Sequence, residues 1–167
     1  MEKLFKTIDS FKGEIVDLQK ILTSISALAP ENGGQGELKK CEALEKWLKK
    51  FGIKNFERYD APDPRVKSGI RPNLVVTLPG EDDKNRLWIM SHLDVVPEGD
   101  KELWDTNPWE VVEKDGKLYG RGVEDDQQGL VASVFALLAL VKNGVVPKRT
   151  VKLLFVADEE VGSKYGI

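Results

Sequence analysis

The sequence of 167 residues is poor in cysteine and histidine, with one of each, and it has no surplus of basic residues. A single cysteine cannot form a disulfide within the chain, and the lack of paired cysteines argues against a thiolate zinc site or an iron–sulfur cluster. The net charge of −3 gives no basic footprint for nucleic acid and no polybasic patch for a membrane. Small partners with little or no charge are therefore favoured.

Long hydrophobic runs are also lacking. The longest largely apolar stretch covers 129–141, whereas a membrane span needs about 20 apolar residues, so this stretch is typical of a helix buried in a soluble protein. The first ten residues, MEKLFKTIDS, lack the apolar segment of a signal peptide, and we expect a cytoplasmic location. Hydrophobic residues make up 41% of the chain and charged residues 32%, which is typical of a single folded unit.

Apolar periodicity predicts both helices and strands. Helices are predicted over 15–28, about 37–51 and about 127–142. Strands are predicted over 53–59, 74–78, 87–90 and 151–157. The polar segment PGEDDKN suits a hairpin between the second and third strands, and the apolar run 87–90 is typical of a buried strand. We therefore expect an α/β fold with a mixed sheet flanked by helices.

The segment SHLDVVP places the only histidine, His92, two residues before Asp94 and just after the apolar run. Open α/β sheets hold their ligand sites at the carboxyl ends of such strands. A neutral imidazole binds metal readily, and a nearby carboxylate can hold its second ring nitrogen. A lone histidine is nevertheless most often an ordinary surface or core residue, so its assignment as a metal ligand depends on two further motifs.

Two acidic motifs follow in the second half of the chain. In GRGVEDDQQG, three acidic residues at 124–126 stand between a glycine-rich turn and a predicted helix. Acidic residues at this position are also explained by capping of that helix and by their interaction with its dipole. In ADEEVGS, three carboxylates at 158–160 gather at a strand end, where solvent or a cation must offset their repulsion. Each motif is ambiguous when taken alone.

Taken together, the three motifs meet the requirements of a hydrolytic metal centre. Such a centre needs bridging and terminal ligands, and a further carboxylate that takes a proton from water and passes it to the leaving group. The adjacent Glu159 and Glu160 could divide these duties. Nitrogen and oxygen ligands suit zinc, manganese or cobalt, and zinc is our first choice.

In their order and spacing, these motifs resemble the M20 family of metallopeptidases and deacylases, which includes dipeptidases, carboxypeptidases, aminoacylases and acetylornithine deacetylases. The resemblance covers most of the chain. It is carried by RPNLVVTLPG (71–80), SHLDVVP (91–97), WDTNPWE (104–110), LYGRGVEDDQQG (118–129) and DEEVGS (158–163). It implies that 1–167 is the N-terminal portion of a zinc-peptidase-like catalytic domain, with three α/β/α layers around a mixed, mostly parallel sheet.

The resemblance also implies a role for each site residue. His92 binds one of two zinc ions, Asp125 bridges both, and Glu160 binds the other. Asp94 orients His92, and Glu159 is the general base and acid. The implied reaction is attack of metal-activated water on the amide carbonyl of a short peptide or an N-acyl amino acid. A homodimer is the implied assembly of the full-length form.

Two departures from the family pattern change this expectation. Many relatives have Lys-Gly after the bridging aspartate and its neighbour, whereas here Gln127 and Gln128 precede Gly129, so Asp126 stays open as an alternative bridge. Family members also continue beyond the Glu-Glu pair, with a further acidic ligand, a second histidine and a lid domain. Each ion would therefore have two expected protein ligands here instead of the usual three. We expect weak or absent metal occupancy, little hydrolysis by this chain alone, and exposed apolar sheet surface.

Two other functions stay open. One is a deacylase of the acetylornithine or succinyl-diaminopimelate type, because substrate choice depends on pockets outside these motifs. The segment GRGVEDD slightly favours a dipeptidase over this alternative. The other is a non-catalytic assembly or binding domain that retains the fold without the remaining ligands.

Overall fold

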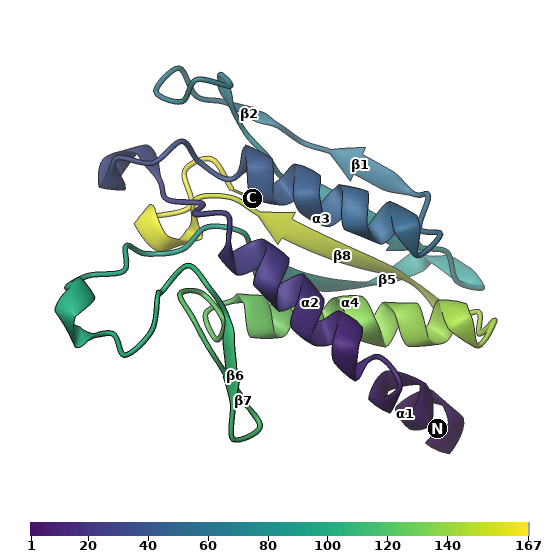
Figure 1. Cartoon of the computed structure of the whole chain (residues 1–167). Helices are drawn as coiled ribbons and strands as arrows, with labels where there is room; N and C mark the ends of the chain where they lie inside the picture. The colour runs from purple at the N-terminus through teal and green to yellow at the C-terminus, as the bar shows by residue number, and fades with distance from the viewer. Residues whose placement is uncertain (167) are drawn as a thin grey trace.

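The computed structural model describes residues 1–166 and contains the predicted mixture of helices and strands (Figure 1). The helices are α1 (Glu2–Asp9), α2 (Lys12–Thr23), α3 (Leu38–Lys50) and α4 (Gln127–Lys142). The strands are β1 (Phe56–Arg58), β2 (Ala61–Pro62), β3 (Ile70–Arg71), β4 (Leu74–Leu78), β5 (Asp82–His92), β6 (Val112–Lys114), β7 (Lys117–Tyr119) and β8 (Arg149–Val156). Short 3-10 helices cover Pro30–Asn32, Lys101–Leu103 and Glu159–Val161.

The helix predicted over 15–28 differs from the observed α2. α2 ends at Thr23, because the chain beyond it becomes extended and the carbonyl of Ala27 accepts a hydrogen bond from the backbone N–H of Val95 at 3.3 Å. This contact ties the segment after α2 to the segment that follows His92. A tertiary hydrogen bond therefore overrides the local helical periodicity here. The predicted bounds of α3, α4 and β4 agree with the structure to within one residue at each end.

The main sheet has the strand order β1–β4–β8–β5. β4 is antiparallel to both of its neighbours, and β5 is parallel to β8. The prediction of a mixed sheet is confirmed, but its mostly parallel character is wrong, because only the β5–β8 pairing of this sheet is parallel in the described residues. The hairpin predicted between β4 and β5 is also wrong. β8 lies between these two strands, since its nearly continuous apolar run is the one suited to the sheet centre.

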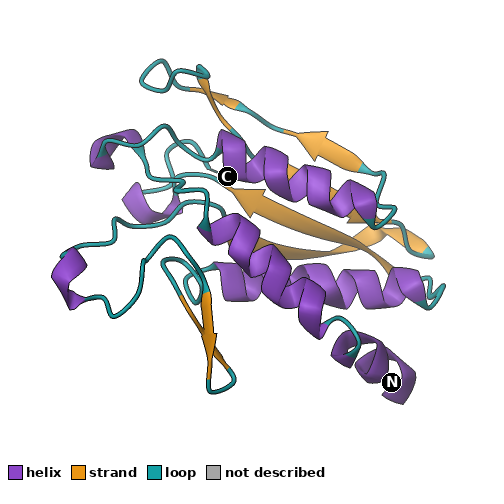
Figure 2. Ribbon diagram, viewed as in Figure 1, coloured by secondary structure: helices purple, strands orange, loops and turns teal. Residues whose placement is uncertain are grey.

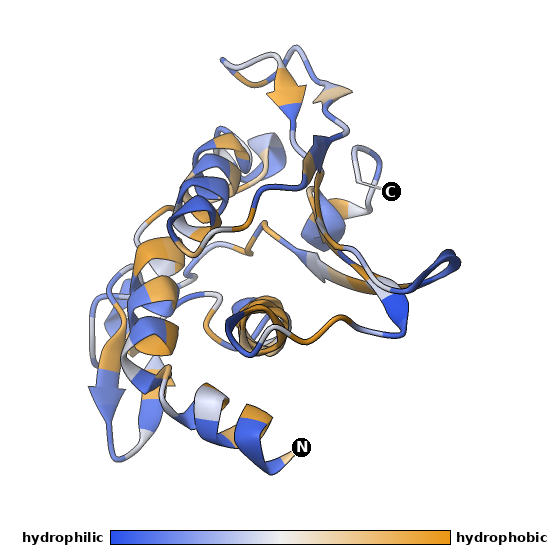
Figure 3. Ribbon diagram, turned by 90° about the vertical axis from the view of Figure 1, so that its right-hand side faces the viewer, coloured by the Kyte–Doolittle hydropathy of each residue, from blue (hydrophilic) through white to orange (hydrophobic). Residues whose placement is uncertain are grey.

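Helices α2, α3 and α4 lie on one side of the sheet (Figure 3). Leu74 and Val76 of β4 point into the core shared with these helices. Val75, Leu154 and Val156 form a separate small cluster on the opposite side, over which no helix of residues 1–166 packs. The predicted three-layer α/β/α architecture is therefore wrong for the described residues, which form two layers.

The edge strand β5 is less buried than the sequence predicts. Trp88 is 49% exposed and Met90 is 62% exposed. The interpretation of 87–90 as a buried strand is wrong, because β5 has β8 as its only strand neighbour within residues 1–166 and no described helix covers its outer face. The expected exposure of apolar sheet surface is confirmed.

The segment between β5 and α4 lies apart from the main sheet. It contains the 3-10 helix Lys101–Leu103 and the antiparallel β6–β7 hairpin, which Figure 2 shows as a separate pair of strands. Among residues 1–166, none of the helices combines the length and the apolar composition that a membrane crossing requires.

Candidate metal centre

The three motifs meet at one edge of the sheet because β5 and β8 run in parallel. His92, the last residue of β5, pairs in register with Val156, the last residue of β8. The carboxyl ends of parallel strands share one edge of a sheet, which is where α/β folds bind ligands. Residues 158–160 follow β8 at this edge, and residues 125–126 precede α4 beside it. The expected position of His92 at the end of a strand is confirmed.

Three side chains come together at this edge. His92, Asp125 and Glu160 each offer one ligand atom, and these atoms all lie within 4.8 Å of one another. The Nε2 atom of His92 is 3.0 Å from Oδ1 of Asp125. The ring of His92 is buried, whereas the side chain of Asp125 is 77% exposed. The cluster is therefore anchored in the core and open to solvent on one side.

Both ring nitrogens of His92 have partners. Nδ1 is 3.1 Å from the carbonyl oxygen of Asp94 and 3.4 Å from its carboxylate, and Nε2 faces Asp125. Burial lowers the pKa of His92, but the hydrogen bonds with Asp94 and Asp125 outweigh it and raise the pKa to about 9. His92 is therefore a cation at neutral pH, and a metal ion must displace its Nε2 proton in order to bind.

Asp94 lies behind His92 and is almost fully buried. Its two carboxylate oxygens accept hydrogen bonds from the backbone N–H groups of Glu159, at 3.1 Å, and of Glu160, at 2.9 Å. Burial raises the pKa of Asp94, but His92 and these two N–H groups outweigh burial and hold it below its usual value. Asp94 thus joins the strand that carries His92 to the turn that carries the two glutamates.

The two glutamates differ in how they face the cluster. The Oε2 atom of Glu159 is 3.8 Å from Nε2 of His92, and its side chain is about half exposed. Glu160 belongs to the close trio, where burial and the charge of Asp125 raise its pKa. A carboxylate with a raised pKa beside another carboxylate is a position at which a cation lowers the electrostatic energy.

The two adjacent aspartates before α4 have different surroundings. Oδ2 of Asp126 accepts a hydrogen bond from the backbone N–H of His92 at 3.2 Å. A Cβ atom at Gly129 would lie 2.5 Å from Oδ1 of Asp126, so glycine at this position makes room for the carboxylate. The peptide bond between Asp125 and Asp126 is cis. Asp126 thus binds the end of β5, whereas Asp125 faces the histidine ring, which favours Asp125 over Asp126 as the ligand.

A buried network of ion pairs lies next to this cluster, and none of the sequence motifs predicted it. Arg71 is fully buried among the carboxylates of Glu37, Asp63 and Asp158. Lys40 is also buried, and burial lowers its pKa to about 8. The signal that could have identified this network is the segment RPN at 71–73, in which charged and polar residues interrupt two strands.

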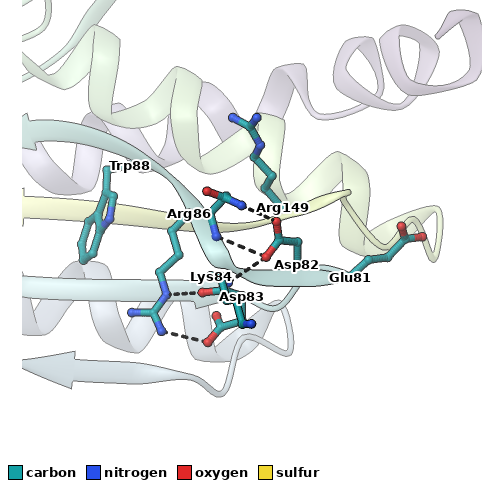
Figure 4. A pocket seen from close by; sticks show the side chains of 8 residues that line it. Glu81, Asp82, Asp83, Lys84, Arg86, Trp88 and Arg149 are labelled. Carbon is teal, nitrogen blue, oxygen red and sulfur yellow. Dashed lines mark hydrogen bonds and ion pairs between the residues drawn. The ribbon is translucent and has the colours of Figure 1, made fainter.

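Another hollow of the surface lies at the beginning of β5 (Figure 4). Two of its acidic side chains have partners nearby in the sequence: Asp82 accepts hydrogen bonds from Asn85, and Asp83 pairs with Arg86 at 2.8 Å. None of the three motifs lines this hollow.

Comparison with known proteins agrees with this geometry. The sequence model described as "Peptidase family M20/M25/M40" matches residues 88–167, which include all three motifs. The part of the chain that carries the three motifs is therefore similar to this family. An uncharacterised metallohydrolase of Methanocaldococcus jannaschii is 44% identical over 158 residues, which are 92% of this chain and 38% of that protein. A succinyl-diaminopimelate desuccinylase of a Nitratiruptor species is 34% identical over 92% of this chain and 36% of its own length.

The fold comparison gives the same result. The crystal structure of human carnosine dipeptidase 1 matches 98% of this chain with a TM-score of 0.77 and 25% sequence identity, over 36% of that structure. The α/β fold with a mixed sheet is therefore that of M20 peptidases. The chain spans less than two fifths of the length of these M20 relatives.

Proposed function

We propose that this chain carries part of the active site of a metal-dependent M20 hydrolase that cleaves an amide bond of a short peptide or an N-acyl amino acid. One observation supports the proposal above the others: His92, Asp125 and Glu160 come from three separate motifs, and their ligand atoms converge within 4.8 Å. If residues 124–126 only capped a helix and residues 158–160 were only solvated, their carboxylates would not be expected to converge on the buried histidine.

The donor set fits a divalent metal. It consists of one imidazole nitrogen and two carboxylate oxygens, a combination that zinc, manganese and cobalt accept and of which zinc is the first candidate. In the proposal, His92 and Asp125 would hold one ion, and Asp125 and Glu160 would hold a second. Such ions would supply Lewis acidity, which activates water and polarises the carbonyl of the scissile amide.

The other residues at the edge have proposed roles that follow from their contacts. Asp94 holds Nδ1 of His92 through its carbonyl and carboxylate oxygens, which directs Nε2 towards Asp125. Glu159 lies within 3.8 Å of Nε2 but is half exposed, so its carboxylate is free to take a proton from water and give it to the leaving nitrogen. We therefore assign Glu159 as general base and acid.

A deacylase is the second candidate, and the relatives favour it. Succinyl-diaminopimelate desuccinylases of Nitratiruptor and Staphylococcus are 33–37% identical to this chain. The structure of a dipeptidase, in contrast, resembles it at 25% identity. Both reactions hydrolyse an amide, so the same residues would serve either one.

We further propose that the chain alone has weak or absent metal occupancy and hydrolyses little substrate. Each ion would have two protein ligands from this chain, whereas a catalytic zinc normally has three. The rest of the ligands would come from polypeptide that corresponds to the remaining length of the relatives. Zinc as the physiological metal, a cytoplasmic location and a homodimer stay predictions.

The test compares this chain with the full-length product of its gene. Metal content and hydrolysis are measured for both, on a panel of dipeptides, N-acetyl and N-succinyl amino acids. We expect tightly bound metal and turnover in the long form only, and loss of turnover in its Glu159→Gln variant with metal retained. Absence of metal and turnover in the long form would contradict the proposal and would favour a non-catalytic binding domain. Tight binding of two ions by the short chain would contradict the predicted weak occupancy.

A further inference from the structure

The segment Arg71-Pro72-Asn73 runs from the last residue of β3 to the start of β4 and has no role in the proposed chemistry. Arg71 is fully buried and Asn73 is 2% exposed. Burial of a guanidinium and an amide costs free energy unless their hydrogen-bonding groups are satisfied. The partners of these two side chains therefore indicate what their burial maintains.

Arg71 joins three separate parts of the chain. Its Nε atom donates to Glu37 at the start of α3 at 2.7 Å, and its Nη2 atom binds the same carboxylate. Its Nη1 atom lies 3.4 Å from Asp63, between β2 and β3, and 3.0 Å from Oδ1 of Asp158. Burial lowers the pKa of Arg71, but these carboxylates outweigh burial and raise it further above its usual value. The cation is thus permanent and faces the turn after β8.

Asp158 organises this turn. Its backbone has φ +68°, a left-handed conformation that aspartate and asparagine adopt more readily than other residues with a side chain. Its Oδ2 atom accepts hydrogen bonds from the backbone N–H groups of Lys164, at 2.9 Å, and Tyr165, at 3.2 Å, and its carbonyl accepts from Ser163. Oδ1 has no hydrogen-bond donor among residues 1–166 and relies on the ion pair with Arg71. Arg71 therefore offsets the charge of the residue that closes the turn.

Asn73 holds both ends of the same turn. Its Oδ1 atom accepts a hydrogen bond from the backbone N–H of Ala157 at 3.1 Å, just before the turn. Its Nδ2 atom donates to the carbonyl of Tyr165 at 2.9 Å, just after the turn, and to the carbonyl of Tyr59 at 3.0 Å. Arg71 and Asn73 thus fix the turn from opposite ends of one tripeptide.

The turn carries the two glutamates of the metal centre. Their backbone N–H groups bind the carboxylate of Asp94, which in turn contacts His92. We propose that Arg71 and Asn73 are positioning residues of the metal centre: they fix the turn at 157–165, so that the amides of Glu159 and Glu160 hold Asp94 while the Glu160 carboxylate faces His92. This inference rests on the proposed function, because the turn is assigned as a bearer of a metal ligand.

The primary variant is Asp158→Asn. Asparagine tolerates the left-handed conformation and can still accept hydrogen bonds from Lys164 and Tyr165, but it loses the charge that pairs with Arg71. Arg71→Lys is the second variant, since it keeps the charge and loses the forked geometry. Arg58→Lys is the matched control, because the ion pairs of Arg58, with Asp60 at 2.8 Å and with Glu45 at 3.7 Å, involve no residue of the turn.

The readout is amide hydrogen exchange by NMR in the metal-free chain, followed by titration with Co²⁺. In Asp158→Asn and Arg71→Lys, we expect the amides of Glu159 and Glu160 to exchange at least about tenfold faster. The amide of Leu93, which donates to Val156 at 2.8 Å in the adjoining strands, is expected to keep its rate. The Co²⁺ dissociation constant measured at the His92 resonances is expected to rise about tenfold in both variants. Arg58→Lys is expected to change neither quantity.

The outcomes separate this inference from the proposed function. Unchanged exchange at Glu159 and Glu160, or an acceleration shared equally with Leu93, would overturn the positioning role and leave only a general contribution to stability. Faster exchange at the two glutamates with an unaltered Co²⁺ dissociation constant would also overturn it. If millimolar Co²⁺ leaves the His92 resonances of the unmodified chain unchanged, the proposed metal centre fails, whatever the exchange rates are.

Discussion

Carboxylates gather at two neighbouring places in this molecule, and the two gatherings differ in what balances their charge. Around Arg71, the carboxylates of Glu37, Asp63 and Asp158 are buried and all face this permanent cation. Around His92, the carboxylates of Asp125 and Glu159 are exposed, and the ring balances their charge only while it carries a proton. The first arrangement needs nothing from outside the chain. The second exchanges its proton readily, and a metal ion can take the place of that proton.

Residues of the motif DEEVGS belong to both arrangements. Asp158 turns inward to Arg71, and Glu160 joins His92 and Asp125. Residues of the same chemical type, two positions apart, thus serve structure and binding respectively. The difference lies in whether an arginine side chain is within reach, which the spacing of acidic residues does not reveal.

The largest expected effect comes from removing the permanent cation. Arg71→Met leaves the buried carboxylates of Glu37 and Asp158 without their cation, while Asp63 keeps its ion pair with Arg65. We expect a loss of about 3–5 kcal/mol in the free energy of unfolding. Urea denaturation followed by tryptophan fluorescence measures it. Asp125→Asn in the open cluster is the control, with an expected change within about 0.5 kcal/mol. If both substitutions cost the same, the two clusters do not differ as described.

A smaller effect is expected from the proton on His92. Its pKa is raised from 6.5 to about 9 in the folded chain, so its stabilisation is fully present below pH 6.5 and disappears as the pH rises through 9. The contribution is at most roughly 3 kcal/mol, and solvent screening reduces it because the partner Asp125 is mostly exposed. The free energies of unfolding of the parent chain and of His92→Gln should therefore converge between about pH 6 and pH 10. A gap that widens with pH would contradict the raised pKa.

The smallest expected change in stability concerns the carboxyl group of Glu160. Because burial and Asp125 raise the pKa of this carboxyl, Glu160→Gln should stabilise the metal-free chain slightly. Millimolar zinc should raise the melting temperature of the parent chain more than that of Glu160→Gln, which keeps only the His92–Asp125 pair of ligands. Glu42→Gln on the exposed side of α3 serves as the control for the loss of one charge. Equal zinc responses in the parent and Glu160→Gln would remove Glu160 from the ligand set.

The sequence predicts well those features that depend on nearby residues. The helix Gln127–Lys142 and the strand Leu74–Leu78 follow their apolar patterns to the residue. The position of His92 at a strand end follows from the polar residues after the run 87–90. The meeting of the three motifs at one edge could also be predicted, because strand ends in α/β folds share an edge.

Features that depend on contacts between residues far apart in the sequence cannot be predicted from the local pattern. The apolar run 87–90 suits a central strand, yet β8 takes that place, because its burial is more complete. The partners of Arg71 come from three regions of the chain, and no spacing within the sequence indicates that they meet. The choice between Asp125 and Asp126 likewise depends on a contact with the backbone of His92.

The insertion of β8 between β4 and β5 has a consequence for how the chain folds during its synthesis. β5 leaves the ribosome before the β6–β7 hairpin, α4 and β8 have been made. At roughly 5–20 residues per second, this strand waits several seconds for the neighbour that satisfies its backbone. During that interval Trp88 and Met90 lie on an unpaired strand of high aggregation tendency. The dense charge at 81–86, just before them, supplies gatekeeper residues that keep the nascent strand in solution until β8 arrives.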